Sequence, residues 1–235
     1  MRIGDIQRFS LIDYPGRICA IIFTQGCNFR CPYCHNPELV GPSLPQKGTP
    51  YGKLMKADDI LAFLERRRGK LDAVNITGGE PLLQHGLIKF IEQVRSLGYL
   101  VKIDTNGSLP KILKKLITKG LLDYIAMDVK APLEKYEKVV NSPIAPENIT
   151  ESIRMILASG IDYEFRTTLV NTLLTEKDLE KIGALIEGAK RYALQRFVPS
   201  KTLDPTFMNK KAWADGELEN IKERLEKSVS SVIIR

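Results

Sequence analysis

The stretch from residue 18 to residue 37 reads ICAIIFTQGCNFRCPYCHNP, and it joins a short apolar run to a loop with three cysteines. The run, residues 18–23, is rich in aliphatic and β-branched side chains, which is typical of a buried strand. Cys27, Cys31 and Cys34 follow with the spacing Cys-x3-Cys-x2-Cys. The sequence therefore predicts a strand whose carboxyl end leads directly into a cysteine-rich loop, residues 24–37.

The same order of strand, loop and helix recurs along the chain. Five more short apolar runs lie at 73–77, 100–104, 124–128, 163–168 and 195–198. Helical spacing of apolar residues is found at 57–67, 87–97, 110–118, 147–158, 176–189 and 215–227. Pro110 opens one of these helices, and Thr175 with Asp178 resembles a helix cap. Strands that alternate with helices indicate a parallel sheet with right-handed crossovers.

Six βα units are too few to close an eight-stranded barrel. We therefore expect an α/β fold of the partial (β/α)6 TIM-type barrel kind, open on one side with parallel strands, and keep a doubly wound sheet as the alternative. The proline- and glycine-rich segment 41–52 reads as a surface loop rather than a linker. The chain is long enough for one large domain, so we expect a single domain over residues 1–235.

Composition and charge limit the kinds of partner and the cellular location that can be expected. The net charge of +7 fits either an acidic partner or anionic ligand, or simply a solvated surface. No basic run is interleaved with aromatic residues, so nucleic acid is not an expected partner. No apolar stretch approaches the roughly 20 residues of a membrane helix, and the first residues lack the apolar core of a signal peptide. We expect a cytoplasmic protein with no membrane partner.

The number of cysteines in the loop favours a reactive metal centre. A structural zinc site uses four protein ligands and disulfides need pairs, whereas three thiolates leave one position of an iron–sulfur cluster open. The alternative is zinc with His35 as fourth ligand, but His35 directly follows Cys34, which makes joint chelation awkward. Cys19 lies within the strand and should be a buried small residue. An open metal position favours an enzyme over a non-catalytic metal-binding module.

Polar residues follow the other predicted strands. They are Gly78-Gly79-Glu80, Asp104-Thr105-Asn106 and Asp128-Val129-Lys130. Because the carboxyl ends of parallel strands meet at one edge, where α/β folds bind ligands, these residues form a candidate site. The glycines allow close approach of the backbone to a ligand. Glu80 either contacts that ligand or orients the loop.

The charged residues of this candidate site need partners. Carboxylates at strand ends require a cation, for which Lys130, a cationic ligand or a bound monovalent cation are the candidates, with a structural ion pair as the alternative. Arg166 lies in an otherwise apolar run, so it either meets an acid or reaches a ligand carboxylate.

The cysteine spacing, the aromatic Tyr33 before the third cysteine, the downstream Gly-Gly-Glu and the six βα units together resemble the radical S-adenosylmethionine superfamily. More narrowly, residues 9–16, 25–37 and 127–130 resemble the activases of glycyl-radical enzymes, most closely those of anaerobic ribonucleoside-triphosphate reductases. Activases of different targets share most of these residues, so pyruvate formate-lyase or another glycyl-radical enzyme is an alternative target. A radical enzyme that acts on a small molecule, such as a 7-carboxy-7-deazaguanine synthase, is a second alternative.

This resemblance implies a [4Fe–4S] cluster on Cys27, Cys31 and Cys34. It also implies reductive cleavage of S-adenosylmethionine to methionine and a 5′-deoxyadenosyl radical, which removes a hydrogen atom from a glycine of the partner enzyme. A flavodoxin or ferredoxin would supply the electron. Since the cluster and cosubstrate carry the difficult chemistry, no acid–base pair is expected among the side chains.

The resemblance and the strand-end positions together predict the S-adenosylmethionine site. Its expected residues are Tyr33, His35, Gly78, Gly79, Glu80, Asp104, Thr105, Asn106, Asp128, Lys130, Arg166, Gln195 and Phe197. Similarity to pyruvate formate-lyase activase further implies a monovalent cation near Asp104, Thr105 and Asp128. Tyr33 should stack near the adenine or shield the cluster, and Phe197 either flanks the adenine or belongs to the core.

Overall fold

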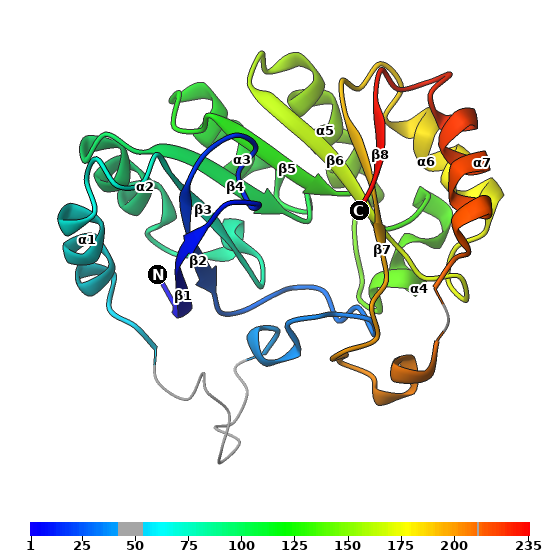
Figure 1. Ribbon diagram of the computed structural model, residues 1–235, viewed down its shortest axis with the longest axis horizontal. Coiled ribbons are helices and arrows are strands. Elements are labelled where there is room, and N and C mark those ends of the chain that lie inside the picture. The colour runs from blue at the N-terminus through cyan, green and yellow to red at the C-terminus, as the bar shows by residue number, and fades with distance from the viewer. Residues whose placement is uncertain (42–53, 211) are drawn as a thin grey trace. The chain divides into compact units, whose positions relative to one another are not determined.

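The computed structural model describes residues 1–41, 54–210 and 212–235, and its strands form one sheet in the order β1 to β8 (Figure 1). Their bounds are β1 Ile3–Ser10, β2 Cys19–Thr24, β3 Ala73–Gly78, β4 Leu100–Thr105, β5 Tyr124–Asp128, β6 Asp162–Leu169, β7 Tyr192–Arg196 and β8 Val232–Ile234. The strand order begins at β1 and ends at β8 and does not return to its start. The expected open, mostly parallel α/β sheet is therefore confirmed.

The predicted helices are present between the strands. Their bounds are α1 Ala57–Arg66, α2 Leu87–Ser96, α3 Pro110–Thr118, α4 Tyr136–Val140, α5 Pro146–Ala158, α6 Glu176–Leu185 and α7 Asp215–Leu225. The short α4 was not predicted. The end expected for α6 at Ala189 was wrong, because Gly188 takes a φ of 80° and its N–H donates to the Ser228 carbonyl at 2.9 Å. Over the described ranges no helix is long and apolar enough to cross a membrane. The loop predicted at 41–52 lies, apart from Gly41, outside the described residues.

The chain divides into two compact units. The first unit comprises Met1–Asn28, Glu38–Thr105 and Lys111–Ile125, and the second comprises Phe29–Pro37, Asn106–Pro110 and Ala126–Arg235. That the whole chain acts as a single domain stays a prediction.

In the first unit, β2, β3 and β4 pair in parallel, and Ile21, Asn75 and Lys102 occupy one row across them. On the opposite face, Ile22, Ile76 and Ile103 are completely buried, as their continuous apolar runs predict. β1 pairs antiparallel with β2, which corrects the expectation of an all-parallel sheet. The sequence did not reveal β1 because it is an edge strand with half of its residues exposed, so it lacks a continuous apolar run.

In the second unit, β6, β7 and β8 are parallel neighbours. The strand predicted at 195–198 lies instead at Tyr192–Arg196, because Tyr192, Ala193 and Leu194 are the buried residues that pair with β8. Phe197 and Val198 follow the strand. β8 escaped prediction because it has only three residues.

Two sets of polar side-chain interactions stabilise this second unit: a helix cap and a buried ion pair. Thr175 and Asp178 form the predicted reciprocal cap of α6, with the Thr175 N–H donating to Asp178 at 2.8 Å. On β6, the carboxylate of Glu164 is 1% exposed and accepts two hydrogen bonds from Arg235, at 3.1 and 2.8 Å. Burial of a carboxylate is unfavourable unless its charge is paired, and the bidentate contact with the Arg235 guanidinium provides that pairing.

Arg235→Ala should lower the free energy of unfolding by about 1–3 kcal/mol, because the buried Glu164 carboxylate loses its charged donors. The matched control is Arg224→Ala, which removes the surface ion pairs of Arg224 with Glu176 and Glu180. This variant should change stability much less. Urea unfolding followed by circular dichroism measures both. Equal losses for the two variants would show that the Glu164 pair contributes nothing beyond a surface pair.

Candidate functional site

The start of the cysteine loop is anchored by backbone hydrogen bonds in the first unit. Gly26 has a φ of 109°, in the region that favours glycine, and its N–H donates to the Leu39 carbonyl at 2.7 Å. The N–H of Cys27 donates to the Val40 carbonyl at 3.0 Å. Gly26 therefore shapes this turn, and it sets the backbone from which the Cys27 side chain projects.

The other two loop cysteines belong to the second unit. The N–H of Cys34 donates to the Cys31 carbonyl at 3.0 Å, and the carbonyl of the intervening Pro32 accepts from the Asp204 N–H at 2.9 Å. Cys31 and Cys34 therefore project from one short turn, and the hydrogen bond from Asp204 connects this turn to a distant part of the chain. Cys31 is buried and Cys34 half-buried.

The donors suit the implied cluster, because soft thiolates favour iron–sulfur centres. Within each unit, the described residues contain no group of three His, Cys, Asp or Glu side chains already gathered as metal ligands. Cys27 lies in the first unit and Cys31 and Cys34 in the second, so the three-thiol ligand set stays a prediction. Cys19 is completely buried, as expected, and burial with the nearby Asp13 raises the pKa of its thiol to about 12.

The two glycines at the end of β3, Gly78 and Gly79, are required because neighbouring backbone atoms lie close to them. A Cβ on Gly78 would lie 2.4 Å from the Thr24 nitrogen, and one on Gly79 would lie 2.2 Å from the Gly26 oxygen. The N–H of Gly79 donates to the Thr24 carbonyl at 2.9 Å. The missing side chains therefore make room for the end of β2, which is a different reason from the ligand approach that we expected; contact with a ligand stays a prediction.

Glu80 orients the loop after β3. It is 1% exposed, and its Oε1 accepts from the Leu82 N–H at 3.1 Å and from the Thr105 hydroxyl at 2.7 Å. The first contact caps the 3-10 helix Pro81–Leu83, and the second joins this loop to the end of β4. Of the two roles considered for Glu80, the structure therefore shows the structural one.

Asp104, at the end of β4, has partners that the sequence analysis missed. Its Oδ1 forms an ion pair with Lys102, and its Oδ2 accepts from the Asn75 amide at 3.2 Å. Lys102 was not among the cations considered for this carboxylate. The available signal was the spacing: residues two apart in a strand point to the same face, so a lysine at position 102 faces the aspartate at 104.

Asp128, at the end of β5, lies between two cations of the second unit. Arg166 Nε is 2.9 Å from its Oδ1, and Lys130 Nζ is 3.0 Å from its Oδ2. Burial acts to raise the pKa of Asp128, but attraction to Arg166 and Lys130 outweighs burial and lowers that pKa to about 2. Burial likewise acts against the charge of Lys130, yet Asp128 raises its pKa above the usual value. Arg166 thus meets an acid, as one of its two predicted roles required.

The aromatic candidates of the second unit lie close to the loop. The rings of His35 and Phe197 stack with centroids 5.6 Å apart and planes 4° apart. Burial, opposed by a backbone hydrogen bond at Val198, lowers the pKa of His35, so the imidazole is neutral at pH 7. Tyr33 is 4% exposed, its hydroxyl has no hydrogen-bond partner among the described residues, and burial raises its pKa well above the usual value.

The two remaining candidates of the second unit occupy different places. Asn106 accepts from the Ser108 N–H and hydroxyl, at 3.0 and 2.6 Å, and so forms a local turn after β4. Gln195 lies in β7, in register with Thr168 of β6. Neither observation tests contact with a ligand, and both assignments stay predictions.

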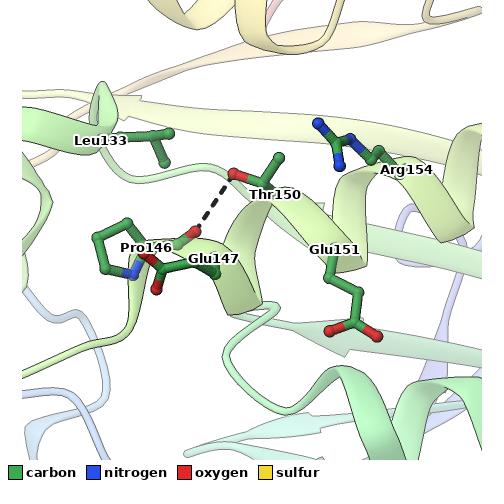
Figure 2. Close-up of a pocket in the computed structure, with 6 residues that line it drawn as sticks. All are labelled: Leu133, Pro146, Glu147, Thr150, Glu151 and Arg154. Atoms are coloured by element: carbon green, nitrogen blue, oxygen red, sulfur yellow. Dashed lines mark hydrogen bonds between the residues drawn. The ribbon is translucent and has the colours of Figure 1, made fainter.

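A surface cavity of about 490 Å³ lies beside α5 (Figure 2). Its lining residues are Leu133, Pro146, Glu147, Thr150, Glu151 and Arg154. The Thr150 hydroxyl donates back to the Pro146 carbonyl at 3.3 Å, so it is used within the helix (Figure 2). None of the predicted site residues lines this cavity, so it is separate from the candidate site.

Known proteins resemble the chain in sequence and in fold. A family model described as the Radical SAM superfamily matches residues 21–187. "Putative glycyl-radical enzyme activating enzyme MJ1227" of Methanocaldococcus jannaschii is 33% identical, over 99% of this chain and 95% of its own length. The pyruvate formate-lyase-activating enzyme of Clostridium pasteurianum is 27% identical, over 86% of this chain and 83% of its own length.

A solved structure supports the same fold. Coproporphyrinogen III oxidase of Escherichia coli, described as a radical SAM enzyme, superimposes with a TM-score of 0.59 over 92% of this chain and 53% of its own, at 15% identity. This agreement concerns the fold alone. The family model covers well over half of the chain, and the first relative matches it almost end to end. On this evidence, the chain belongs to the radical S-adenosylmethionine superfamily and is an enzyme of that class.

Proposed function

We propose that this chain is a glycyl-radical-enzyme activase, which cleaves S-adenosylmethionine reductively at a [4Fe–4S] cluster and forms a glycyl radical on a partner enzyme. The observation that carries the proposal is the match to a relative named as an activating enzyme over 99% of this chain and 95% of that relative.

Cys27, Cys31 and Cys34 would hold the cluster, which when bound supplies the electron for the cleavage. The chain provides three thiolates and leaves the fourth position to the cosubstrate. Backbone hydrogen bonds of Gly26, Cys27 and Cys34 hold the loop in a defined conformation. Such preorganisation reduces the conformational entropy that cluster binding must remove.

The second unit supplies groups suited to the cosubstrate. Asp128, Lys130 and Arg166 together carry one negative and two positive charges, which favours an anionic group such as a carboxylate beside them. The neutral His35 ring, stacked on Phe197, offers a flat and partly apolar surface. The buried Tyr33 hydroxyl would donate to a polar atom of the bound group, because an unsatisfied buried hydroxyl is unfavourable.

A protein substrate is favoured by an exposed apolar segment of the first unit. Phe9, Leu11 and Ile12 are 48%, 63% and 88% exposed, within the stretch 9–16 that resembles activases. Clustered exposed apolar side chains are typical of protein-binding surfaces. Anaerobic ribonucleoside-triphosphate reductase is our proposed partner, with flavodoxin or ferredoxin as electron donor and the cytoplasm as location. Pyruvate formate-lyase is the alternative partner.

Replacing any one of Cys27, Cys31 and Cys34 by alanine should prevent stable cluster assembly, because each provides one thiolate ligand. Cys19→Ala is the matched control, since the Cys19 thiol is buried in β2 and its raised pKa keeps it protonated. Iron and sulfide per chain, with visible absorbance after anaerobic reconstitution, measure the result. Equal iron loss in the Cys19 variant would refute the ligand assignment.

Asp128→Asn should weaken S-adenosylmethionine binding by about 1–3 kcal/mol, because Lys130 and Arg166 lose the charge that positions them. Glu134→Gln, which changes an exposed carboxylate paired with Lys181, is the control and should bind normally. Equilibrium dialysis with the cluster-loaded protein measures both. Unchanged binding in Asp128→Asn would mean that the ion pairs of Asp128 with Lys130 and Arg166 only stabilise the fold.

The full reaction should give a glycyl doublet in electron paramagnetic resonance when the protein, a reductant and S-adenosylmethionine are mixed with anaerobic ribonucleotide reductase. Pyruvate formate-lyase serves as the comparison partner. Replacing the partner's radical glycine by alanine should remove the doublet, while cleavage of the cosubstrate can continue. If no glycyl-radical enzyme gives a doublet but a small molecule accelerates cleavage, the small-molecule alternative replaces the activase.

A further inference from the structure

Lys102 is a buried lysine at the middle of a sheet. It lies on β4 in the row Ile21–Asn75–Lys102, and its side chain is only 3% exposed. Lysine is almost never fully buried unless its charge is compensated. Here the ammonium pairs with Asp104, and it lies 5.9 Å from the centroid of the Tyr124 ring, within cation–π range. The first unit therefore places an ammonium group next to the carboxylate at the end of β4.

Asp104 is held on both of its oxygens by side chains of the same unit. Oδ1 pairs with Lys102, and Oδ2 accepts from Asn75, which is 1% exposed. The neighbouring Thr105 donates its hydroxyl proton to Glu80 at 2.7 Å. Thus two of the three residues that the resemblance places around a monovalent cation already have defined partners within the first unit.

This arrangement does not suit a metal cation on Asp104. A cation bound to either carboxylate oxygen would lie close to the Lys102 ammonium, where like charges repel strongly because little water screens them. A tethered ammonium also avoids the loss of translational freedom that binding a free ion requires. Lys102 meets the need of Asp104 for a counter-charge without any ion from solution.

We propose that the Lys102 ammonium takes the place of the monovalent cation beside Asp104, so that this strand end works without sodium or potassium. The part of the proposal that concerns the cosubstrate rests on the proposed function. The part that concerns the cation does not, because the Lys102–Asp104 ion pair and the hydrogen bond from Asn75 involve only residues of this chain. Lys102 is thus a positioning residue for Asp104.

The direct test follows sodium binding to the whole chain, without cluster or cosubstrate, by the line width of ²³Na resonances. The wild type and Asp104→Asn should behave alike: neither should show saturable broadening of the sodium resonance that depends on the Asp104 carboxylate. Lys102→Met removes the ammonium that pairs with Asp104, so this variant should gain a saturable sodium site that potassium competes for. The double variant Lys102→Met/Asp104→Asn should lose that site again.

A sodium site in the wild type that Asp104→Asn removes would overturn the proposal, and so would a folded Lys102→Met variant that gains no site. Circular dichroism establishes folding. Should Lys102→Met not fold, the wild type and Asp104→Asn still decide: a sodium site that depends on Asp104 overturns the proposal, and its absence upholds it.

The second test measures S-adenosylmethionine binding to the cluster-loaded protein in sodium, potassium and choline chloride at one ionic strength. The wild-type Kd should be the same in all three salts within about twofold, whereas Lys102→Met should bind about tenfold more weakly in choline and recover in sodium or potassium. Lys119→Met, which removes an exposed lysine paired with Glu92, is the matched control and should behave as wild type. Loss of wild-type binding in choline would overturn the proposal.

The two tests separate the proposals. If no partner enzyme yields a glycyl radical, the sodium titrations remain valid, because they need neither cofactor nor partner. If the wild type requires sodium while the glycyl doublet is observed, the activase function stands and the role of Lys102 falls.

Discussion

The backbones of two chain segments of the first unit lie in close contact where β2 and β3 end. Gly79 donates to the Thr24 carbonyl, Glu80 donates to the Gly26 carbonyl, and a Cβ on Gly79 would lie 2.2 Å from the Gly26 oxygen. This contact fixes the backbone at the first cysteine and, through Glu80, the loop that reaches Thr105. The cysteine loop and the strand-end residues of this unit therefore depend on glycine at positions 78 and 79, because any larger residue would separate the two strand ends.

Buried charge is handled in the same manner in both units. Asp104 pairs with Lys102 two residues before it, and Asp128 pairs with Lys130 two residues after it. Each carboxylate therefore has a cation only two residues away in the sequence. For Asp104 this cation lies on the same face of β4, because alternate residues of a strand share a face. Charges that are held in this way in a water-poor environment need little reorganisation when a charged ligand binds.

The division of work between protein and cofactor explains why no acid–base pair is needed. In the proposed activase, the bond cleavage depends on cluster and cosubstrate, while the side chains bind, orient and exclude water. The described residues agree with that role: Tyr33 of the loop is buried with a raised pKa, the pKa of His35 is lowered, and Asp128, Lys130 and Arg166 are held in ion pairs. The exposed Phe9, Leu11 and Ile12 add a surface suited to another protein.

The sequence by itself determined the order of βα units, the cysteine loop and the family. Strands β2 to β6 could be predicted because each is a short buried run with its own apolar signal, and the cap of α6 because Thr175 and Asp178 act locally. Only the tertiary structure decided the rest. β1 pairs at an exposed edge, and β7 is defined by its register with β8. Gly78 and Gly79 are required because the end of β2 lies against them. Lys102 lies beside Asp104, whose other oxygen accepts from Asn75. These features depend on which strands become neighbours and in what register, and local residue patterns carry no such long-range information.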